Sequence, residues 1–346
     1  MTAITYLDTT LRDGSHALDH DLSTDLVRQV SGDLARAGVR YVEVGHGAGL
    51  GGSSLLMGKS TASDTDLLDA AADADVVLTT LLVPGFGTLE ELQVAVEHGV
   101  RAVRVATHVT EADVGLQHLT AARDLGLMAI GFLMMAHSAP PDVIAEQAAM
   151  MDGAGAQVVY LADSAGNMLG DDVRARVSAV RRRVGCELGL HMHNNLGVAI
   201  TNSLAGVEEG VTWIDGSLGG LGAGAGNTPA EVLAVVLQRL GLQTGIDADV
   251  LMDSAEDVVR PQMKHPQVID RESLIIGDAG VYSSFLGKAQ KLGKEYGVAP
   301  RELLLEAGRM NAVAGQEDLL EDFAVAIARR RTTSPSATGP AAATAW

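Results

Sequence analysis

Eight short apolar segments recur along the first two-thirds of the chain, each followed by a stretch with a helical pattern. The segments are rich in β-branched and aliphatic residues, and their hydrophobicity is continuous rather than alternating. Continuous hydrophobicity is expected of strands that are buried on both faces of a parallel sheet. We therefore predict strands at Ile4–Thr9, Tyr41–Gly45, Val76–Val83, Ala102–Ala106, Met128–Met134, Val158–Ala162, Leu188–His193 and Trp213–Leu218.

The stretches between these segments carry the start and stop signals of helices. Thr88 followed by Glu91 indicates a capping box, and Gly38 and Gly99 stand where a left-handed residue ends a helix. Eight strand–helix units over about 240 residues are typical of a (β/α)₈ TIM barrel, an α/β fold. The alternative, a doubly wound open sheet, would have a Gly-rich nucleotide-binding loop after its first strand. This chain has RDGSH there.

The pattern changes after Gly241, where the strand segments stop and several helical patterns follow. We predict a TIM-barrel catalytic domain in residues 1–245 and a small helical C-terminal domain in residues 246–331. Residues 332–346 are of low complexity, which predicts a disordered tail.

Composition excludes several classes of function. The net charge of -19 argues against nucleic acid and anionic membranes as partners. One cysteine, Cys186, leaves no intrachain disulfide and fits a reducing compartment. The N-terminal residues do not resemble a signal peptide, and no apolar stretch is long enough to span a bilayer. We expect a cytoplasmic protein.

The first cluster of chemically useful residues is LRDGSH, at the exit of the first predicted strand. It offers a cation at Arg12, a carboxylate at Asp13 and an imidazole at His16. In a TIM barrel this end of a strand forms the catalytic face. The alternative is an ordinary solvated turn with an Arg–Asp pair.

The second cluster is HMHNN, at the exit of the seventh strand. His191 and His193 are two residues apart, so both can point to the same side of a strand and bind one ion. Incidental histidines are the alternative. Strands one and seven are separated around the barrel only by strand eight, so Asp13 could complete a His–His–carboxylate site.

Three further residues are weaker candidates. Ser164 follows the sixth strand and could bind a ligand or cap the next helix. Glu43 and His46, at the end of the second strand, could support the residues that contact substrate.

These motifs, in this order, resemble the DRE-TIM metallolyase superfamily. The finer resemblance is to its class II pyruvate aldolases, the 4-hydroxy-2-oxovalerate aldolases of aromatic hydrocarbon catabolism. It rests on TTLRDGSHA, VEVGHGAGLGGSS, TTLLVPGFGT, VRVATHVTEADV, GFLMMAHSAP, GAGAGNTPAEV, DAGVYSSFL and GQED, which run from residue 8 to about residue 318.

The resemblance implies that Asp13, His191 and His193 bind Mn²⁺ or another divalent ion such as Co²⁺ or Mg²⁺. It implies that Arg12 holds the pyruvate oxygen and stabilises the enolate. It also implies that His16 is the general base for the C4 hydroxyl. The expected reaction is retro-aldol cleavage of 4-hydroxy-2-oxopentanoate to pyruvate and acetaldehyde.

The rest of the implied substrate site comes from other parts of the chain. Leu81 and Val83 are expected to line the aldehyde pocket, where Val83 replaces a more usual Leu. Tyr282, in the helical domain, is expected to reach into the site. Ser164 and His191 complete the expected substrate-binding set.

The resemblance also implies a partner, an acylating acetaldehyde dehydrogenase that receives the aldehyde through a channel. The expected assembly is a heterotetramer with two of each subunit. Two alternatives remain open at this point. One is a Claisen-type synthase of the same superfamily that joins an acyl-CoA to a 2-oxo acid. The other is a non-catalytic subunit that stabilises a dehydrogenase.

Overall fold

The computed structural model describes residues 3–55, 57–313 and 315–333. It contains two compact units, Met1–Gly280 and Val281–Trp346. The division falls after Gly280, whereas the sequence pattern predicts a domain boundary at 245. That boundary stays a prediction. The predicted tail lies almost wholly outside the described residues.

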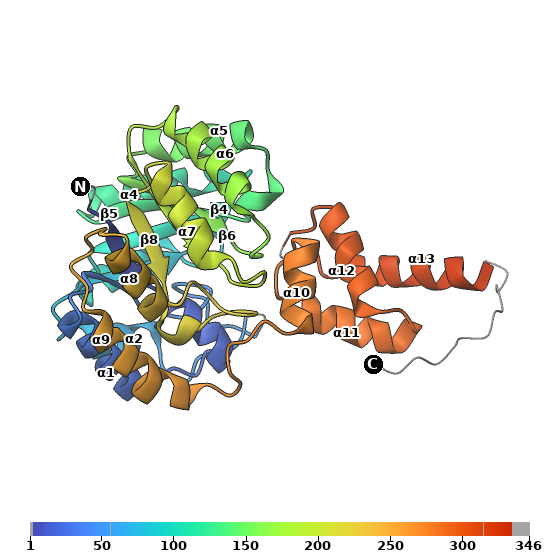
Figure 1. Cartoon of the computed structure of the whole chain (residues 1–346), viewed down its shortest axis with the longest axis horizontal. Helices are drawn as coiled ribbons and strands as arrows, with labels where there is room; N and C mark the ends of the chain where they lie inside the picture. Colours follow the sequence, from blue (N-terminus) through green and yellow to red (C-terminus); the bar gives the residue numbers. More distant parts are fainter. Residues whose placement is uncertain (1–2, 56, 314, 334–346) are drawn as a thin grey trace. The chain divides into compact units, whose positions relative to one another are not determined.

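The first unit is built on a closed barrel of eight parallel strands, paired in chain order with β8 against β1 (Figure 1). This confirms the predicted (β/α)₈ fold, and each strand ends within two residues of the predicted bounds. The strands are β1 Thr5–Asp8, β2 Tyr41–Glu43, β3 Val77–Leu82, β4 Ala102–His108, β5 Met128–Met134, β6 Val158–Asp163, β7 Glu187–Met192 and β8 Trp213–Gly216.

Helices follow the strands and cover the outside of the barrel (Figure 1). Thr88 and Glu91 form the predicted capping box of α3, and Gly38 and Gly99 have the positive φ angles expected after a helix. The barrel helices are α1 Thr24–Arg36, α2 Asp64–Ala71, α3 Leu89–Glu97, α4 Leu116–Asp124, α5 Pro141–Gly153, α6 Gly170–Arg181, α7 Ala199–Glu208 and α8 Ala230–Arg239.

Two further helices, α9 Ala248–Asp253 and α10 Arg271–Ala279, also belong to the first unit. The second unit contains α11 Phe285–Tyr296, α12 Pro300–Arg309 and α13 Leu319–Thr333. Within the second unit, Ser284 donates a hydrogen bond to Glu317, and Tyr296 donates one to Glu321. These bonds join the start of α11 to the segment before α13 and the end of α11 to the first turn of α13.

Alternate residues of each strand point into the barrel. A cluster of apolar side chains fills this interior, with Leu7, Ile130, Tyr160 and Trp213 among its members. Gly189 of β7 leaves room for the ring of Tyr160, because a β-carbon there would collide with it. The interior is therefore packed, and ligands can approach only at the ends of the strands.

Because all strands run in the same direction, their carboxyl ends meet at one rim. β8 lies between β7 and β1, so the segments that follow β1 and β7 are neighbours at this rim. His191 lies in β7 and Asp13 begins a 3₁₀-helix, Asp13–Leu18, just after β1.

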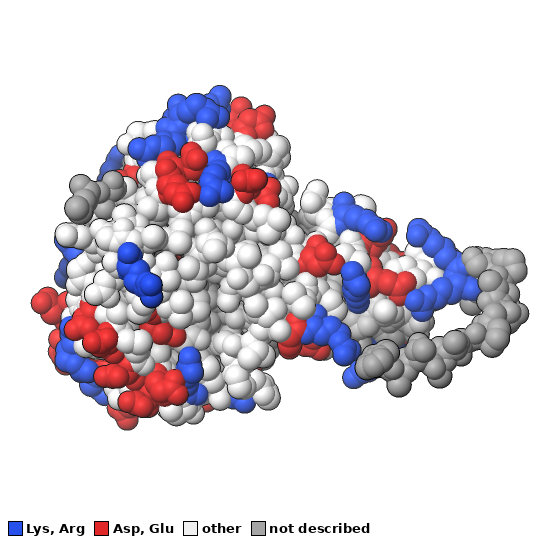
Figure 2. All heavy atoms as spheres, in the orientation of Figure 1, with Lys and Arg blue, Asp and Glu red and all other residues white. Residues whose placement is uncertain are grey.

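In the described part of the chain, no helix is both long and apolar enough to cross a bilayer. On the face shown in Figure 2, Lys and Arg are interspersed with Asp and Glu over α5 and α6 and over α1 and α9. The band over α7 between these groups is largely uncharged.

Candidate metal centre and active site

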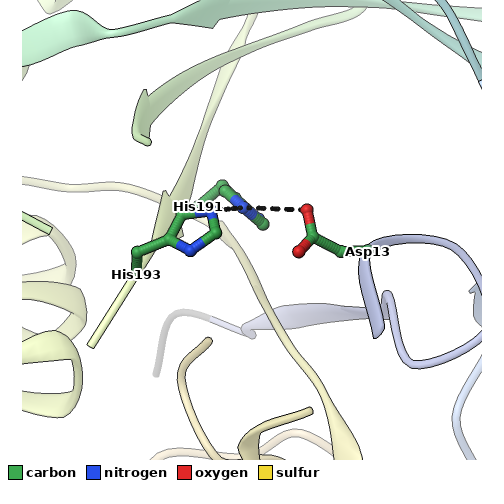
Figure 3. A group of neighbouring side chains, drawn as sticks. All are labelled: Asp13, His191 and His193. Carbon is green, nitrogen blue, oxygen red and sulfur yellow. Dashed lines mark hydrogen bonds and ion pairs between the residues drawn. The ribbon is translucent and has the colours of Figure 1, made fainter. Parts of the chain in front are cut away.

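Three buried side chains converge at the rim of the barrel (Figure 3). One ligand atom each from Asp13, His191 and His193 lies within 4.8 Å of the others. Nε2 of His191 is 3.2 Å from Nε2 of His193 and 3.7 Å from Oδ2 of Asp13. The predicted ligand set is thus brought together in space, although more than 170 residues separate Asp13 from His191 along the chain.

Asp215 of β8 fixes the orientation of His191. Nδ1 of His191 is 2.9 Å from both carboxylate oxygens of Asp215. A carboxylate accepts, so Nδ1–H donates and the lone pair of Nε2 faces Asp13 and His193. This is the tautomer that a metal ligand needs.

The carboxylate of Asp13 is also held from both sides. Its Oδ2 accepts from Nη1 of Arg12 at 2.6 Å, and its Oδ1 accepts from Nδ2 of Asn227 at 3.1 Å. Burial raises the pKa of Asp13, but Arg12, His193 and His191 together hold this pKa well below its usual value. Asp13 is therefore an anion at neutral pH.

These residues fit a divalent metal ion. Two imidazole nitrogens and one carboxylate suit Mn²⁺, Co²⁺ or Zn²⁺, and such a set leaves coordination positions open for substrate. Oδ1 of Asn227, beside Asp13, is buried and has no hydrogen-bond partner among the described residues. The donor set and this unpartnered oxygen both point to a cation site.

Arg12 is 3 % exposed and lies next to these ligands. Its Nε donates to Oε2 of Glu43 at 2.6 Å, and its Nη1 donates to Asp13. Its Nη2 is buried and has no partner within the described chain. A guanidinium fixed in this way keeps one donor for an anionic oxygen.

Sequence reasoning identified Glu43 as a supporting residue but missed Arg104, Asp215 and the contact of Asn227. Arg104 lies in β4, is fully buried, and hydrogen-bonds both Glu43 and Asp215. The sequence carries one signal for Arg104 and Asp215. Each is a charged residue inside an apolar strand segment, Arg104 in VRV and Asp215 in WID. A charge in such a segment must have a buried partner.

His16 lies in the 3₁₀-helix that begins at Asp13. Its ring packs edge-on against His20 at 4.8 Å, and His20 stacks on His46 at 3.9 Å. Gly47 permits this stack, because a β-carbon there would collide with His16 and His20. Burial lowers the pKa of His16 more than Asp13 raises it, so its imidazole is neutral at pH 7 and able to accept a proton.

The remaining predicted residues lie in three different settings. Leu81 and Val83 pack with the apolar interior cluster. The hydroxyl of Ser164 accepts a hydrogen bond from the backbone N of Met135 at 3.1 Å, and Ser164 caps no helix. Tyr282 belongs to the second compact unit. The substrate contacts of these residues stay predictions.

Two family models match the chain. An HMGL-like model covers residues 3–258 and a DmpG-like communication domain covers residues 267–329. The first contains the whole barrel and every residue of the metal centre. The second begins before α10 and includes Tyr282.

The chain is similar over most of its length to curated 4-hydroxy-2-oxovalerate aldolases. The protein of Thermomicrobium roseum is 50% identical over 332 residues, which is 95% of this chain and 93% of that protein. The protein of a Roseiflexus species is 50% identical over 337 residues, which is 97% of this chain and all of that protein.

Solved structures show the same fold at low identity. The carboxyl transferase domain of Rhizobium etli pyruvate carboxylase superposes with a TM-score of 0.77 at 16% identity, covering 95% of this chain and 61% of that one. The HMG-CoA lyase of Brucella melitensis gives a TM-score of 0.64 at 20% identity, covering 77% of this chain and all of that one. From the family models and the half-identical relatives, the chain belongs to the HMGL-like family and, within it, to the 4-hydroxy-2-oxovalerate aldolases, which are carbon–carbon lyases.

Proposed function

We propose that this enzyme uses one divalent metal ion, Mn²⁺ or a similar ion such as Co²⁺ or Mg²⁺, to cleave 4-hydroxy-2-oxopentanoate or a close 4-hydroxy-2-oxo acid. The products are pyruvate and a short aldehyde, acetaldehyde for the named substrate. One observation carries this proposal: Asp13, His191 and His193 converge beside Arg12, whose Nη2 is buried and unpartnered in the described structure.

Retro-aldol cleavage needs a base for the C4 hydroxyl and a sink for the electrons released at C3. A divalent cation on Asp13, His191 and His193 would supply a Lewis acid for the 2-oxo group. Arg12 provides fixed positive charge at the same place, with Nη2 free to donate to the developing enolate oxygen. Its bonds to Glu43 and Asp13 prevent it from turning away.

His16 is the residue best suited to be the base. It takes the C4 hydroxyl proton, the C3–C4 bond breaks, and the C4 oxygen becomes the aldehyde carbonyl. The bonding electrons form the C2–C3 double bond of the pyruvate enolate. The enolate then takes a proton at C3 from water, and His16 returns its proton to the solvent. Neutrality of His16 at pH 7 supports this role, because a protonated imidazole could not accept the proton.

The aldehyde end of the substrate meets the apolar side of the rim in this proposal. Leu81 and Val83 pack with the interior cluster there and would limit the length of the aldehyde. Ser164 and Tyr282 are proposed as further substrate contacts, Tyr282 from the communication domain.

We also propose a partner for the chain in the cytoplasm, an acylating acetaldehyde dehydrogenase. The DmpG-like communication domain at residues 267–329 supports such a contact. A complex with two of each subunit would let the aldehyde pass directly between active sites, without release to water.

The test is a coupled assay on the purified full chain with Mn²⁺ and 4-hydroxy-2-oxopentanoate. Lactate dehydrogenase and NADH report the pyruvate released. We expect pyruvate with Mn²⁺ and almost none with excess chelator. Absence of pyruvate with Mn²⁺, both with and without the dehydrogenase, would contradict the proposal.

A further inference from the structure

Arg104 is a fully buried charge in the middle of the barrel. It lies in β4, and its guanidinium packs over the rings of Phe132 and Tyr160, 4.6 Å and 5.2 Å from their centroids. A buried arginine in an apolar interior is costly unless each part of its fork is paired. The pairs that it makes show what holds it there.

The fork of Arg104 divides between two carboxylates on different strands. Its Nε donates to Oε1 of Glu43 at 2.6 Å, and its Nη2 donates to Oε2 of Glu43. Its Nη1 donates to Oδ2 of Asp215 at 2.6 Å. One side chain of β4 thus fixes a carboxylate of β2 and a carboxylate of β8 at once.

Each of these carboxylates in turn holds a residue of the active site. Glu43 accepts from Nε of Arg12 at 2.6 Å. Asp215 accepts from Nδ1 of His191 at 2.9 Å. Two chains of hydrogen bonds therefore start at Arg104, one ending at the enolate-stabilising arginine and the other at a metal ligand.

The geometry points to Arg104 as a positioning residue that fixes the orientation of both the metal ligand His191 and Arg12, through two separate carboxylates. This inference rests on the proposed function, because it assumes the metal site and the role of Arg12. Arg104 does not touch the ligand atoms itself. It acts by fixing the direction in which the carboxylates of Glu43 and Asp215 point.

The charges of the network agree with this role. Burial raises the pKa of Glu43, but Arg104 and Arg12 lower it to about 2, so Glu43 is an anion. Two buried cations, Arg12 and Arg104, face three buried carboxylates, Asp13, Glu43 and Asp215. Counted as formal charges, the network is net negative by one. A divalent cation would make it net positive by one, which complements the single negative charge of a 2-oxo acid.

Lysine cannot replace Arg104 in this arrangement. An ammonium group carries the same charge but lacks the planar fork, so it cannot hold two carboxylates that approach from different directions. Arg104→Lys should therefore leave at least one of the two chains unsupported. The substitution tests geometry while it preserves charge.

The experiment measures two affinities on the full-length chain by calorimetry. One is for Mn²⁺, and the other is for oxalate at saturating Mn²⁺, since oxalate is a planar dianion like the pyruvate enolate. We expect Asp215→Asn to weaken Mn²⁺ binding about 10-fold or more. Glu43→Gln should mainly weaken oxalate binding, and Arg104→Lys should weaken both.

A matched control is Arg176→Lys. Arg176 donates to the backbone carbonyls of Ala136, His137 and Ala139 and has no contact with the network. We expect this control to lower the Tm and to leave both affinities within about twofold, as for a residue with only a structural role. Arg104→Lys that folds and binds both ligands like the wild type would overturn the inference.

A double-mutant cycle keeps the inference testable if Arg104→Lys does not fold. Arg104 alone bridges Glu43 and Asp215 directly, whereas the other described route is longer and passes through Arg12, Asp13 and His191. We expect the effects of Glu43→Gln and Asp215→Asn on Mn²⁺ affinity to be coupled by about fivefold or more. Additive effects would overturn the inference. A wild-type chain that binds no Mn²⁺ would overturn the proposed function and this inference with it.

Discussion

The rim of the barrel has two sides of opposite character. The polar wall comes from β1, β2, β7, β8 and the loops that follow them, and it consists of Arg12, Asp13, Glu43, His191, His193, Asp215 and Asn227. The apolar wall comes from β3, the residue that follows it, β5 and β6, and it consists of Leu81, Val83, Phe132, Met134 and Ala162. Both walls combine inward-facing residues of parallel strands with residues that directly follow those strands. Their difference suggests a division of work between bond cleavage and recognition of the aldehyde.

The two walls also differ in how they are stabilised. Each charge of the polar wall is buried and depends on a partner, so removing one side chain leaves another uncompensated. The apolar wall is held by packing, and losing a methyl group costs a graded amount. Substitutions in the polar wall should therefore abolish activity, whereas those in the apolar wall should change preference.

The largest effect is expected for His16→Ala, beside the polar wall. Turnover should fall about 10³-fold, because the base for the C4 hydroxyl is lost. Bound Mn²⁺ should be retained, since His16 is not among the three ligands. The coupled pyruvate assay and metal analysis of the same sample check both points. A variant that keeps its turnover would exclude His16 as the base.

Arg12→Lys should have the next largest effect. Lysine keeps the charge but cannot bond Glu43 and Asp13 while it still presents a free donor to the enolate. We expect kcat to fall about 100-fold, the cost of one preorganised donor to an oxyanion. Steady-state kinetics at saturating Mn²⁺ measures this. A kcat within about threefold of wild type would mean that charge alone is sufficient.

Val83→Ala tests the apolar wall. Removing two methyl groups should shift the ratio of kcat/KM towards 4-hydroxy-2-oxohexanoate over the pentanoate by about 10-fold. Exchange of the methyl protons of pyruvate in D₂O needs only the polar wall, so its rate should not change. If exchange slows as much as cleavage, the two walls do not act separately.

The smallest effect concerns pH and His20, in the histidine stack next to the polar wall. Burial, with His16 and His46, lowers the pKa of His20 to about 4. In the unfolded chain it is near 6.5, so between these values the unfolded state binds more protons. The contribution of neutral His20 to the stability of the fold is then complete above about pH 6.5 and is lost progressively as the pH falls towards 4.

We expect His20→Asn to reduce the loss of Tm between pH 7 and pH 5 by about 3 °C. Asparagine tolerates the positive φ of 61° at this position, which limits other effects. Thermal unfolding of both proteins at the two pH values measures this difference. An identical loss of Tm in wild type and variant would exclude His20 as the titrating group.

The barrel was predictable because each strand has a recognisable pattern in its own residues. Runs such as Met128–Met134 are apolar throughout and end at turn residues, so their bounds follow from the chain alone. The metal ligands were predictable for a similar reason. His191 and His193 are two residues apart on one strand, and a closed barrel order puts Asp13 next to them.

The supporting network could not be predicted in the same way. The residues around Arg104 in the sequence do not indicate which carboxylates it hydrogen-bonds, because Glu43 is 61 and Asp215 is 111 positions away. Those pairings depend on side-chain direction and on the depth of each residue in the barrel. The sequence shows only that a charged residue lies in an apolar strand and therefore needs a buried partner.

The most direct test of the metal centre is a titration of the metal-free full chain with Mn²⁺. The EPR signal of the free ion reports how much Mn²⁺ remains unbound. The wild type should bind one ion per chain, whereas His191→Ala and Asp13→Asn should bind none in the same concentration range. His98→Ala, which removes a surface histidine paired with Asp69, is the matched control and should bind like the wild type. If His191→Ala and Asp13→Asn bind Mn²⁺ as tightly as the wild type, Asp13, His191 and His193 are not the metal centre.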